Sequence, residues 1–166
     1  TKTHTPTVAT FQTPTHGPLG IIMKHDILWF KTAEPRVRFD LKQITGTVPI
    51  IKAYAGMGIG DGIISLLAPE KIDGVVIEAL GAGNLPPLAA REIKSLMDKG
   101  VPVVLVSRCF NGIAEPVYAY EGGGVKLQEA GVMFIKELNA PKARLKLLIA
   151  LSAGLEGQEL KDYIEG

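Results

Sequence analysis

The chain has 166 residues and a formal net charge of +1 at pH 7; 46% of its residues are hydrophobic and 21% are charged. This composition is typical of a globular protein, and the length suits one domain with an attached hairpin or tail. The near-neutral charge gives no reason to expect nucleic acid or an anionic membrane as a partner, and no apolar run approaches the ~20 residues of a membrane span.

The first 41 residues predict two kinds of structure. Residues 1–17 are rich in threonine and contain prolines and histidines, which favours an extended linker. Residues 18–30 predict a β-hairpin, because two β-prone runs, Leu19–Met23 and Ile27–Phe30, are separated by three polar residues. Charged and apolar residues alternate from Glu34 to Leu41, which predicts a strand or an extended arm.

From Val48 onward, short apolar runs alternate with helical patterns. This order predicts a small parallel β-sheet of about four strands flanked by helices, Rossmann-like or flavodoxin-like in class. Residues that suit helix caps stand at the expected helix ends: Asp61 and Asn139 at the beginning of a helix, and Gly100 at the end of one. The predicted strands span 48–54, 75–79, 101–106 and 132–135, and the predicted helices span 61–67, 88–99, 139–152 and 157–164.

The stretch from Asp73 to Pro87 is the best candidate for a binding site. Its apolar first half predicts a buried strand, and Gly81, Gly83 and Asn84 then form a turn before a helix. Ligands of open parallel sheets gather at the carboxyl ends of strands, which is where Asn84 is expected. Glu115 and Glu121 follow the third predicted strand, at the same edge. A carboxylate and the Asn84 amide together can hold an amino-acid ammonium group, although solvated loop residues are the simpler interpretation.

Other candidate sites are weaker. The glycine-rich loop 56–62 with Glu78 resembles a dinucleotide-binding fingerprint, but Asp61 occupies the third glycine position and would repel a pyrophosphate. The three histidines lack metal-ligand spacing, so no metal or cofactor is expected. Cys109 follows a strand but has no nearby histidine as a base, which favours a packed cysteine. The residues alone therefore indicate a binding or structural domain.

Several stretches, in this order along the chain, resemble the C-terminal domain of bacterial L-asparaginases. They are Gly74–Pro86, Val101–Arg108 followed by Asn111-Gly112, and Leu138–Arg144. Weaker matches precede them at 17–20, 39–40 and 50–54, so the resemblance covers essentially the whole chain. It implies an interdomain linker at 1–17 and an asparaginase C-terminal domain at 18–166, with an N-terminal hairpin at 18–30.

This family hydrolyses L-asparagine to L-aspartate and ammonia without a cofactor. Its catalytic threonines lie in an N-terminal domain, within motifs such as Thr-Gly-Gly-Thr that this sequence does not contain. The resemblance therefore implies an inactive C-terminal domain when isolated, with the N-terminal catalytic domain of the same protein as its partner. It also implies a homodimer or homotetramer, and a cytoplasmic location with an exported form left open.

The resemblance also suggests roles for individual residues. Asn84 matches a position that approaches the bound amino acid across the dimer interface. Glu121 matches a carboxylate that binds the substrate ammonium, with Glu115 as the competing candidate. Cys109 and the loop after it could line a second, allosteric asparagine site. Two alternatives stay open: an asparaginase-like subunit of a tRNA-dependent amidotransferase, and a non-enzymatic α/β binding domain.

Overall fold

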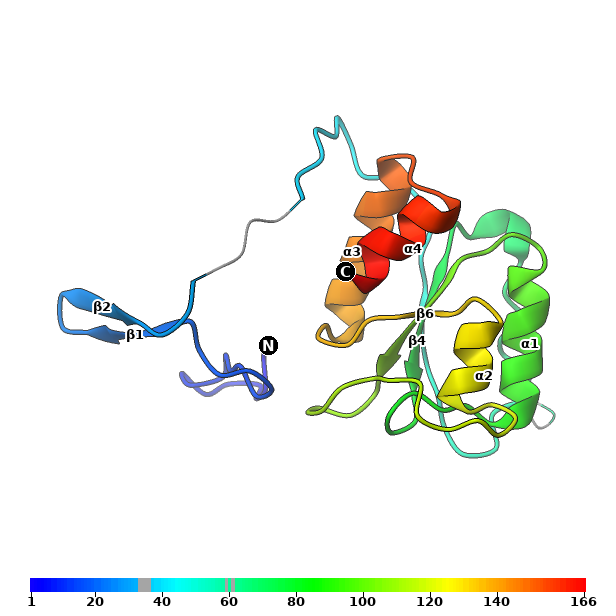
Figure 1. The fold of residues 1–166 in the computed structure, drawn as a ribbon, viewed down its shortest axis with the longest axis horizontal. Coiled ribbons are helices and arrows are strands. Elements are labelled where there is room, and N and C mark those ends of the chain that lie inside the picture. Colours follow the sequence, from blue (N-terminus) through cyan, green and yellow to red (C-terminus); the bar gives the residue numbers. More distant parts are fainter. Residues whose placement is uncertain (33–36, 59, 61) are drawn as a thin grey trace. The chain divides into compact units, whose positions relative to one another are not determined.

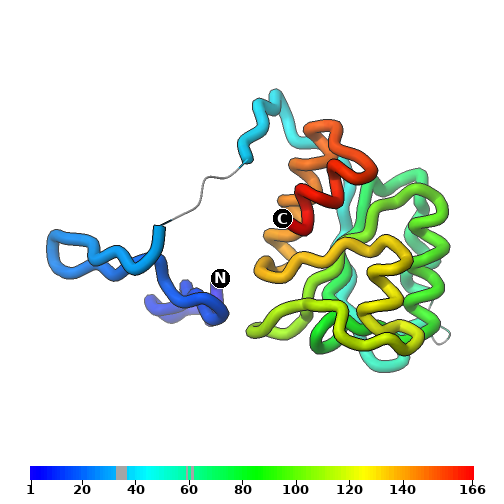
Figure 2. The backbone as a smooth tube through the Cα atoms, in the orientation of Figure 1, coloured from blue at the N-terminus to red at the C-terminus, as the bar shows by residue number. Residues whose placement is uncertain are grey.

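The computed structural model describes residues 1–32, 37–58, 60 and 62–166. These residues form two compact units, Thr1–Arg38 and Phe39–Gly166, which are described separately below. Figures 1 and 2 trace the backbone of both units. The expected helix cap Asp61 lies outside the described residues, and so does the beginning of the arm expected from Glu34. The remainder of that arm, residues 37–41, forms no strand.

The first unit contains the predicted hairpin. Strand β1 (Gly20–Met23) pairs with strand β2 (Asp26–Trp29) in antiparallel register, which confirms the prediction. The preceding segment is not extended as expected, because Lys2 pairs with Phe11 and the Thr3 N–H donates to the Thr10 carbonyl over 2.7 Å. The hydroxyl of Thr10 also accepts a hydrogen bond from the His4 N–H, at 3.0 Å. Its side chain thus helps to fold residues 1–17 back on themselves.

The second unit is built on a four-stranded parallel sheet with the order β3-β4-β5-β6. This confirms the predicted fold class. The two central strands are almost entirely apolar, as expected for strands covered on both faces. The strands are β3 (Ile50–Lys52), β4 (Val75–Ala79), β5 (Val103–Ser107) and β6 (Met133–Phe134).

Helices cover both faces of this sheet (Figure 1). Successive strand residues point to opposite faces, so Ile77 and Leu105 pack with α1 and α2, whereas Val76 and Val104 pack with α3 and α4. All four of these strand side chains are fully buried. The helices are α1 (Pro87–Met97), α2 (Gly124–Glu129), α3 (Ala140–Ser152) and α4 (Gly157–Glu165).

The predicted caps of the two long helices are confirmed. The Asn139 side chain accepts a hydrogen bond from the Lys142 N–H at the start of α3, at 3.3 Å. Gly100 follows α1 with a φ of +87°, a left-handed conformation that glycine adopts without strain. These two helix ends could therefore be predicted correctly from the capping residues alone.

Two predictions of secondary structure in the second unit were wrong. Residues 62–67 form turns in place of a helix, followed by a short 3₁₀-helix, η1 (Pro69–Lys71). The positive φ of Gly60 and Gly62, +76° and +51°, is incompatible with a right-handed helix at this point. Helix α2 was missed, because it begins in a stretch rich in glycine and tyrosine that favours a loop.

Candidate functional site

The candidate site begins with a tight turn at the carboxyl end of β4. The N–H groups and carbonyls of Leu80 and Asn84 exchange two hydrogen bonds, each 2.9 Å long. Gly83 lies within this turn with a φ of +123°, and a Cβ added there would come within 2.8 Å of the Phe134 ring. The turn therefore lies directly on the sheet core, and it places the half-buried Asn84 at the sheet edge that the sequence predicted.

The loop 114–124 is hydrogen-bonded to this turn along its length. The Glu115 N–H donates to the Ala82 carbonyl at 2.7 Å, and the Leu85 N–H donates to the Gly122 carbonyl at 2.8 Å. A third bond runs from the Gly124 N–H to Oδ1 of Asn84, at 3.3 Å. These three bonds bring together the segments that carry the predicted site residues.

The bond from Gly124 fixes how Asn84 can act. Oδ1 accepts this hydrogen bond with one of its two lone pairs, and the Nδ2 group supplies two donors. No partner of Nδ2 is found within the described part of the chain. The loop therefore orients the Asn84 amide and leaves Nδ2 as a donor.

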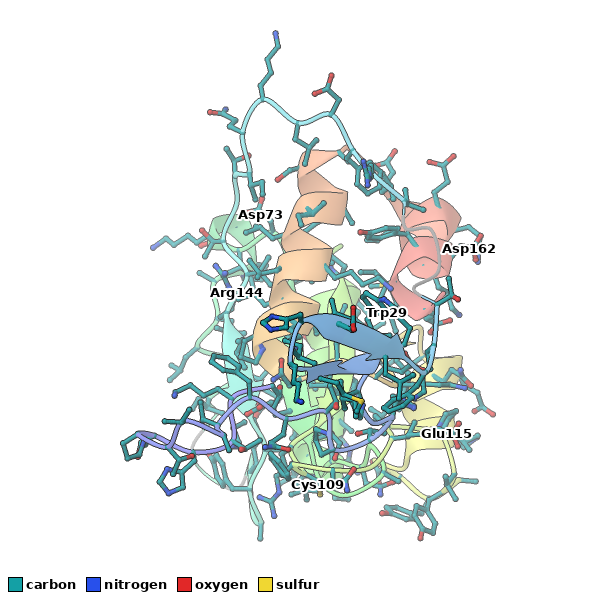
Figure 3. All side chains as sticks on the ribbon, turned by 90° about the vertical axis from the view of Figure 1, so that its left-hand side faces the viewer. Trp29, Asp73, Cys109, Glu115, Arg144 and Asp162 are labelled. Carbon is teal, nitrogen blue, oxygen red and sulfur yellow. The ribbon has the colours of Figure 1, made fainter. Side chains whose placement is uncertain are left out.

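Both candidate carboxylates are in ion pairs. Glu121 Oε1 lies 2.7 Å from Nε of Arg91 on α1, and Glu115 Oε1 lies 3.3 Å from Nζ of Lys136. Their side chains are 55% and 49% exposed, so both remain accessible to a ligand (Glu115 is labelled in Figure 3). The sequence did not indicate these two cations, because each pairing depends on the tertiary fold.

Arg91 lowers the pKa of Glu121. The hydrogen bond from Arg91 holds the pKa of Glu121 below its usual value of 4.5. Replacing Arg91 by glutamine is expected to raise this pKa, as measured by NMR titration of the side-chain carboxyl carbon. Since the pKa is lowered in the folded protein, the pair contributes stability above the ordinary carboxyl pKa, and loses it as pH falls through the lowered value.

A matched control lies on the same helix. Lys94 pairs with Asp98 through a 2.9 Å contact and does not touch Glu121, so Lys94→Gln is expected to leave the pKa of Glu121 unchanged. Equal titration curves for wild type and Arg91→Gln would show that Arg91 does not set this pKa.

Cys109 lies exposed just beyond β5, so the expectation of a packed cysteine is wrong (Figure 3). Its N–H donates to Oγ of Ser107 at 3.0 Å, and this hydroxyl donates to the Gly81 carbonyl at 2.6 Å. The Arg108 guanidinium donates to the Ala53 carbonyl at 2.9 Å. Ser107 and Arg108 thus link the ends of three neighbouring strands and position the segment that carries Cys109, a role that sequence reasoning missed.

The structure does not support a dinucleotide-binding site at the glycine-rich loop. That motif needs a helix directly after the glycine-rich loop, and residues 62–67 are turns. Gly58 instead packs against the start of α1, where an added Cβ would lie 2.8 Å from Leu88 Cβ. Glu78 is engaged with Lys52, with 3.4 Å between Oε2 and Nζ.

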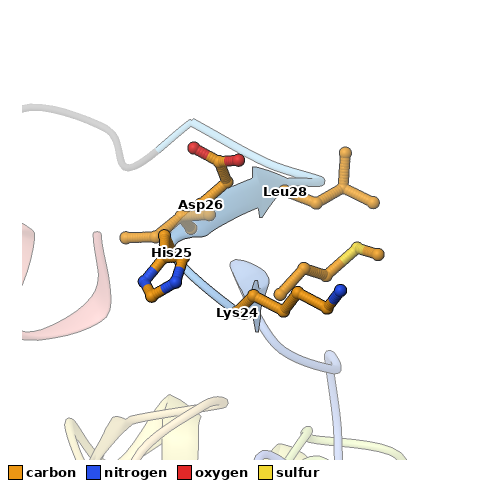
Figure 4. A pocket seen from close by; sticks show the side chains of 6 residues that line it. Lys24, His25, Asp26 and Leu28 are labelled. Atoms are coloured by element: carbon orange, nitrogen blue, oxygen red, sulfur yellow. The ribbon is translucent and has the colours of Figure 1, made fainter.

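Other kinds of site receive no support from the residues that the structure describes. Among them, no group of three or more histidine, cysteine or acidic side chains could hold a metal ion. None of the helices found in those residues has the length and hydropathy needed to cross a membrane. An open hollow at the hairpin turn is lined by consecutive residues, Met23–Leu28, and so lacks groups converging from separate elements (Figure 4).

Comparison with known proteins places this chain in a family. Residues 47–164 match the glutaminase/asparaginase C-terminal domain. A protein of Deinococcus radiodurans named "Probable L-asparaginase" is 41% identical over 97% of the chain, which covers 49% of that protein. One component of a glutamyl-tRNA(Gln) amidotransferase from Pyrococcus furiosus is 33% identical over 79% of the chain, which covers 29% of that component.

The fold also matches a solved structure. A probable cytoplasmic L-asparaginase from Campylobacter jejuni superposes with a TM-score of 0.77 at 24% identity, over 99% of this chain and 50% of that one. At this identity the match shows the fold. The chain thus spans about half the length of the Deinococcus radiodurans and Campylobacter jejuni proteins. The parallel sheet and the family match over 47–164 lead to one conclusion: the chain belongs to the glutaminase/asparaginase family, and it contains that family's C-terminal domain.

Proposed function

We propose that this chain is the C-terminal half of a two-domain L-asparaginase, which hydrolyses L-asparagine to L-aspartate and ammonia. The observation that carries the proposal is the 41% identity, over nearly the whole chain, to a protein named as a probable L-asparaginase. The N-terminal domain supplies the nucleophilic threonine, and the present chain supplies residues that hold the substrate. Residues 1–17 serve as the linker between the two domains. The full-length protein is a homodimer or homotetramer in the cytoplasm.

Asn84 contributes as a hydrogen-bond donor. Its Oδ1 is held by the Gly124 N–H, so Nδ2 donates to a carboxylate or carbonyl oxygen of the substrate. Glu121 accepts a charge-assisted hydrogen bond from the substrate ammonium, which it shares with Arg91. Glu115 is the competing acceptor, and it is paired with Lys136 in the same way. Comparing KM for asparagine in Glu121→Gln and Glu115→Gln decides which carboxylate binds the ammonium.

Ammonia release from asparagine tests the proposal. The full-length protein is expected to release ammonia, and the purified 166-residue chain is expected to be inactive because the nucleophile lies in the other domain. Turnover by the chain alone would place the nucleophile within it, with Thr1 and Cys109 as the first residues to replace. An inactive full-length protein would contradict the assignment of an asparaginase.

Cys109 is proposed as part of an allosteric asparagine site, since it is exposed and held at the sheet edge by the Ser107 hydroxyl. A sigmoidal dependence of rate on asparagine concentration is expected for the full-length enzyme, and Cys109→Ala should alter it. Hyperbolic kinetics that are the same in both proteins would exclude this role.

A role in a tRNA-dependent amidotransferase is the second candidate, and the Pyrococcus furiosus relative favours it. It is the weaker one, because the Deinococcus relative is more similar and is matched over more of the chain. Ammonia release from free asparagine, with no partner protein and no tRNA present, separates the two functions.

A further inference from the structure

Ser107 is the last residue of β5 and lies beside the turn that carries Asn84. Side chains alternate between the two faces of a strand, so Ser107 points to the same face of the sheet as Leu105. The turn 80–84 lies on this face as well, because a Cβ added to Gly83 would come within 3.2 Å of Leu105 Cδ2. Strand β5 therefore supports the turn at two points, through packing at Leu105 and through the hydroxyl of Ser107.

The Ser107 hydroxyl makes two hydrogen bonds. Its Oγ donates to the Gly81 carbonyl at 2.6 Å and accepts from the Cys109 N–H at 3.0 Å. The first distance lies at the short end of the usual range for an O–H···O bond. The register between β4 and β5 ends with the pair Ala79–Ser107, so this bond continues the connection beyond the last pair of the ladder.

The turn depends on such a bond because of its own sequence. Gly81 and Gly83 have φ values of +52° and +123°, and glycine adopts many other conformations at little cost. A Cβ added to Gly81 would have no atom within 4 Å, so close packing does not hold this end of the turn. The bond from Ser107 therefore fixes the Gly81 carbonyl where packing does not.

Asn84 is at the other end of the same turn. Its N–H donates to the Leu80 carbonyl at 2.9 Å, and its Oδ1 accepts from the Gly124 N–H at 3.3 Å. Because the turn is closed at Leu80 and Asn84, a displacement of Gly81 is passed on to the Asn84 amide. A displacement of about 1 Å in a group that positions a substrate can cost ~100-fold in rate.

We propose that Ser107 is a positioning residue for substrate binding: its hydroxyl fixes the turn 80–84 and thereby the direction of the Asn84 amide, without touching the substrate. This inference rests on the proposed asparaginase function and on the proposed role of Asn84. The competing explanation is a contribution to stability alone, since a hydrogen bond within the protein stabilises the fold. The two explanations differ in whether the effect of Ser107 on catalysis depends on Asn84.

The test is a double-mutant cycle in the full-length protein. Ser107→Ala is expected to lower kcat/KM for L-asparagine by about 2- to 10-fold, the range for one lost hydrogen bond, mainly through a higher KM. In an Asn84→Asp background the same substitution should change kcat/KM by less than about twofold, because the donor that Ser107 positions is already absent. Ser107→Thr keeps the hydroxyl at a strand position and is expected to restore kcat/KM.

Ser152 supplies a matched control. Its hydroxyl also donates to a carbonyl and accepts from an N–H group, both belonging to Thr45 and both at 3.1 Å. Thr45 precedes β3 whereas Gly81 follows β4, so Ser152 lies at the opposite edge of the parallel sheet from the candidate site. Ser152→Ala is therefore expected to lower Tm, as Ser107→Ala does, and to leave kcat/KM unchanged.

Hydrogen exchange, followed by mass spectrometry of the full-length protein, gives a readout that does not depend on activity. Peptides that cover residues 80–84 and 114–124 are expected to exchange faster in Ser107→Ala than in the wild type. The second peptide is included because the Glu115 N–H donates to the Ala82 carbonyl of the turn. Exchange in both peptides should be unchanged in Ser152→Ala.

Four results would overturn the inference. They are an unchanged kcat/KM in Ser107→Ala, an equal loss in the wild-type and Asn84→Asp backgrounds, unchanged hydrogen exchange in Ser107→Ala, and a Ser107→Thr enzyme as impaired as Ser107→Ala. An inactive wild type whose turn exchanges faster in Ser107→Ala would instead contradict the proposed function and leave the attachment of the turn by Ser107 intact.

Discussion

Replacing Asn84 by aspartate in the full-length protein is expected to lower kcat/KM for L-asparagine by about 10- to 100-fold, the range for losing a hydrogen bond to a charged group. The carboxylate can still accept the hydrogen bond from the Gly124 N–H, so the loop 114–124 keeps its attachment. What is lost is the Nδ2 donor that we propose binds the substrate, and a negative charge takes its place. Steady-state kinetics combined with thermal unfolding measures this effect.

Two further variants isolate the donor function. Asn84→Ala removes both the donor and the acceptor, so it should lower Tm as well as kcat/KM. Asn139→Asp makes the same chemical change at the start of α3, where the Asn139 side chain accepts from the Lys142 N–H at 3.3 Å, and it should leave kcat/KM near the wild-type value. An Asn84→Asp enzyme with unchanged kcat/KM would exclude a substrate contact through Nδ2.

Gly122→Ala is expected to lower the free energy of unfolding by about 2–5 kcal/mol, the combined range for left-handed backbone strain and overpacking. Gly122 has a φ of +85°, and an added Cβ would lie 2.2 Å from the Leu85 carbonyl oxygen. This oxygen is a backbone atom beside the Leu85–Gly122 hydrogen bond, so the contact can be relieved only by breaking the attachment of the loop to the turn. Urea unfolding of the 166-residue chain measures the change.

Gly81→Ala separates backbone strain from the steric clash. Gly81 also has a positive φ, +52°, but an added Cβ there would have no atom within 4 Å. Its cost should be limited to the strain, about 1–2 kcal/mol. If Gly122→Ala and Gly81→Ala lowered the free energy of unfolding equally, the steric clash with Leu85 would add nothing to the cost of backbone strain.

The sequence by itself determined the elements whose signals are local. The run Val75–Ala79 was predicted as a buried strand and is β4 with those bounds, since a short β-branched apolar run suits a strand covered on both faces. Asn139 was predicted to cap a helix and does so at the start of α3, because capping depends on the cap residue and the next three residues. Asn84 was likewise placed at the end of a strand by its position after the glycine turn.

The tertiary structure alone decided how the candidate site is assembled. The bond from Gly124 to Asn84 joins residues 40 positions apart, and the Arg91–Glu121 pair joins residues 30 positions apart. A distant contact also explains a glycine of the loop, because Gly122 lies against the Leu85 backbone. Periodicity and capping act within a few residues, whereas the direction of the Asn84 amide and the charge partner of Glu121 depend on which distant segments the folded sheet brings together.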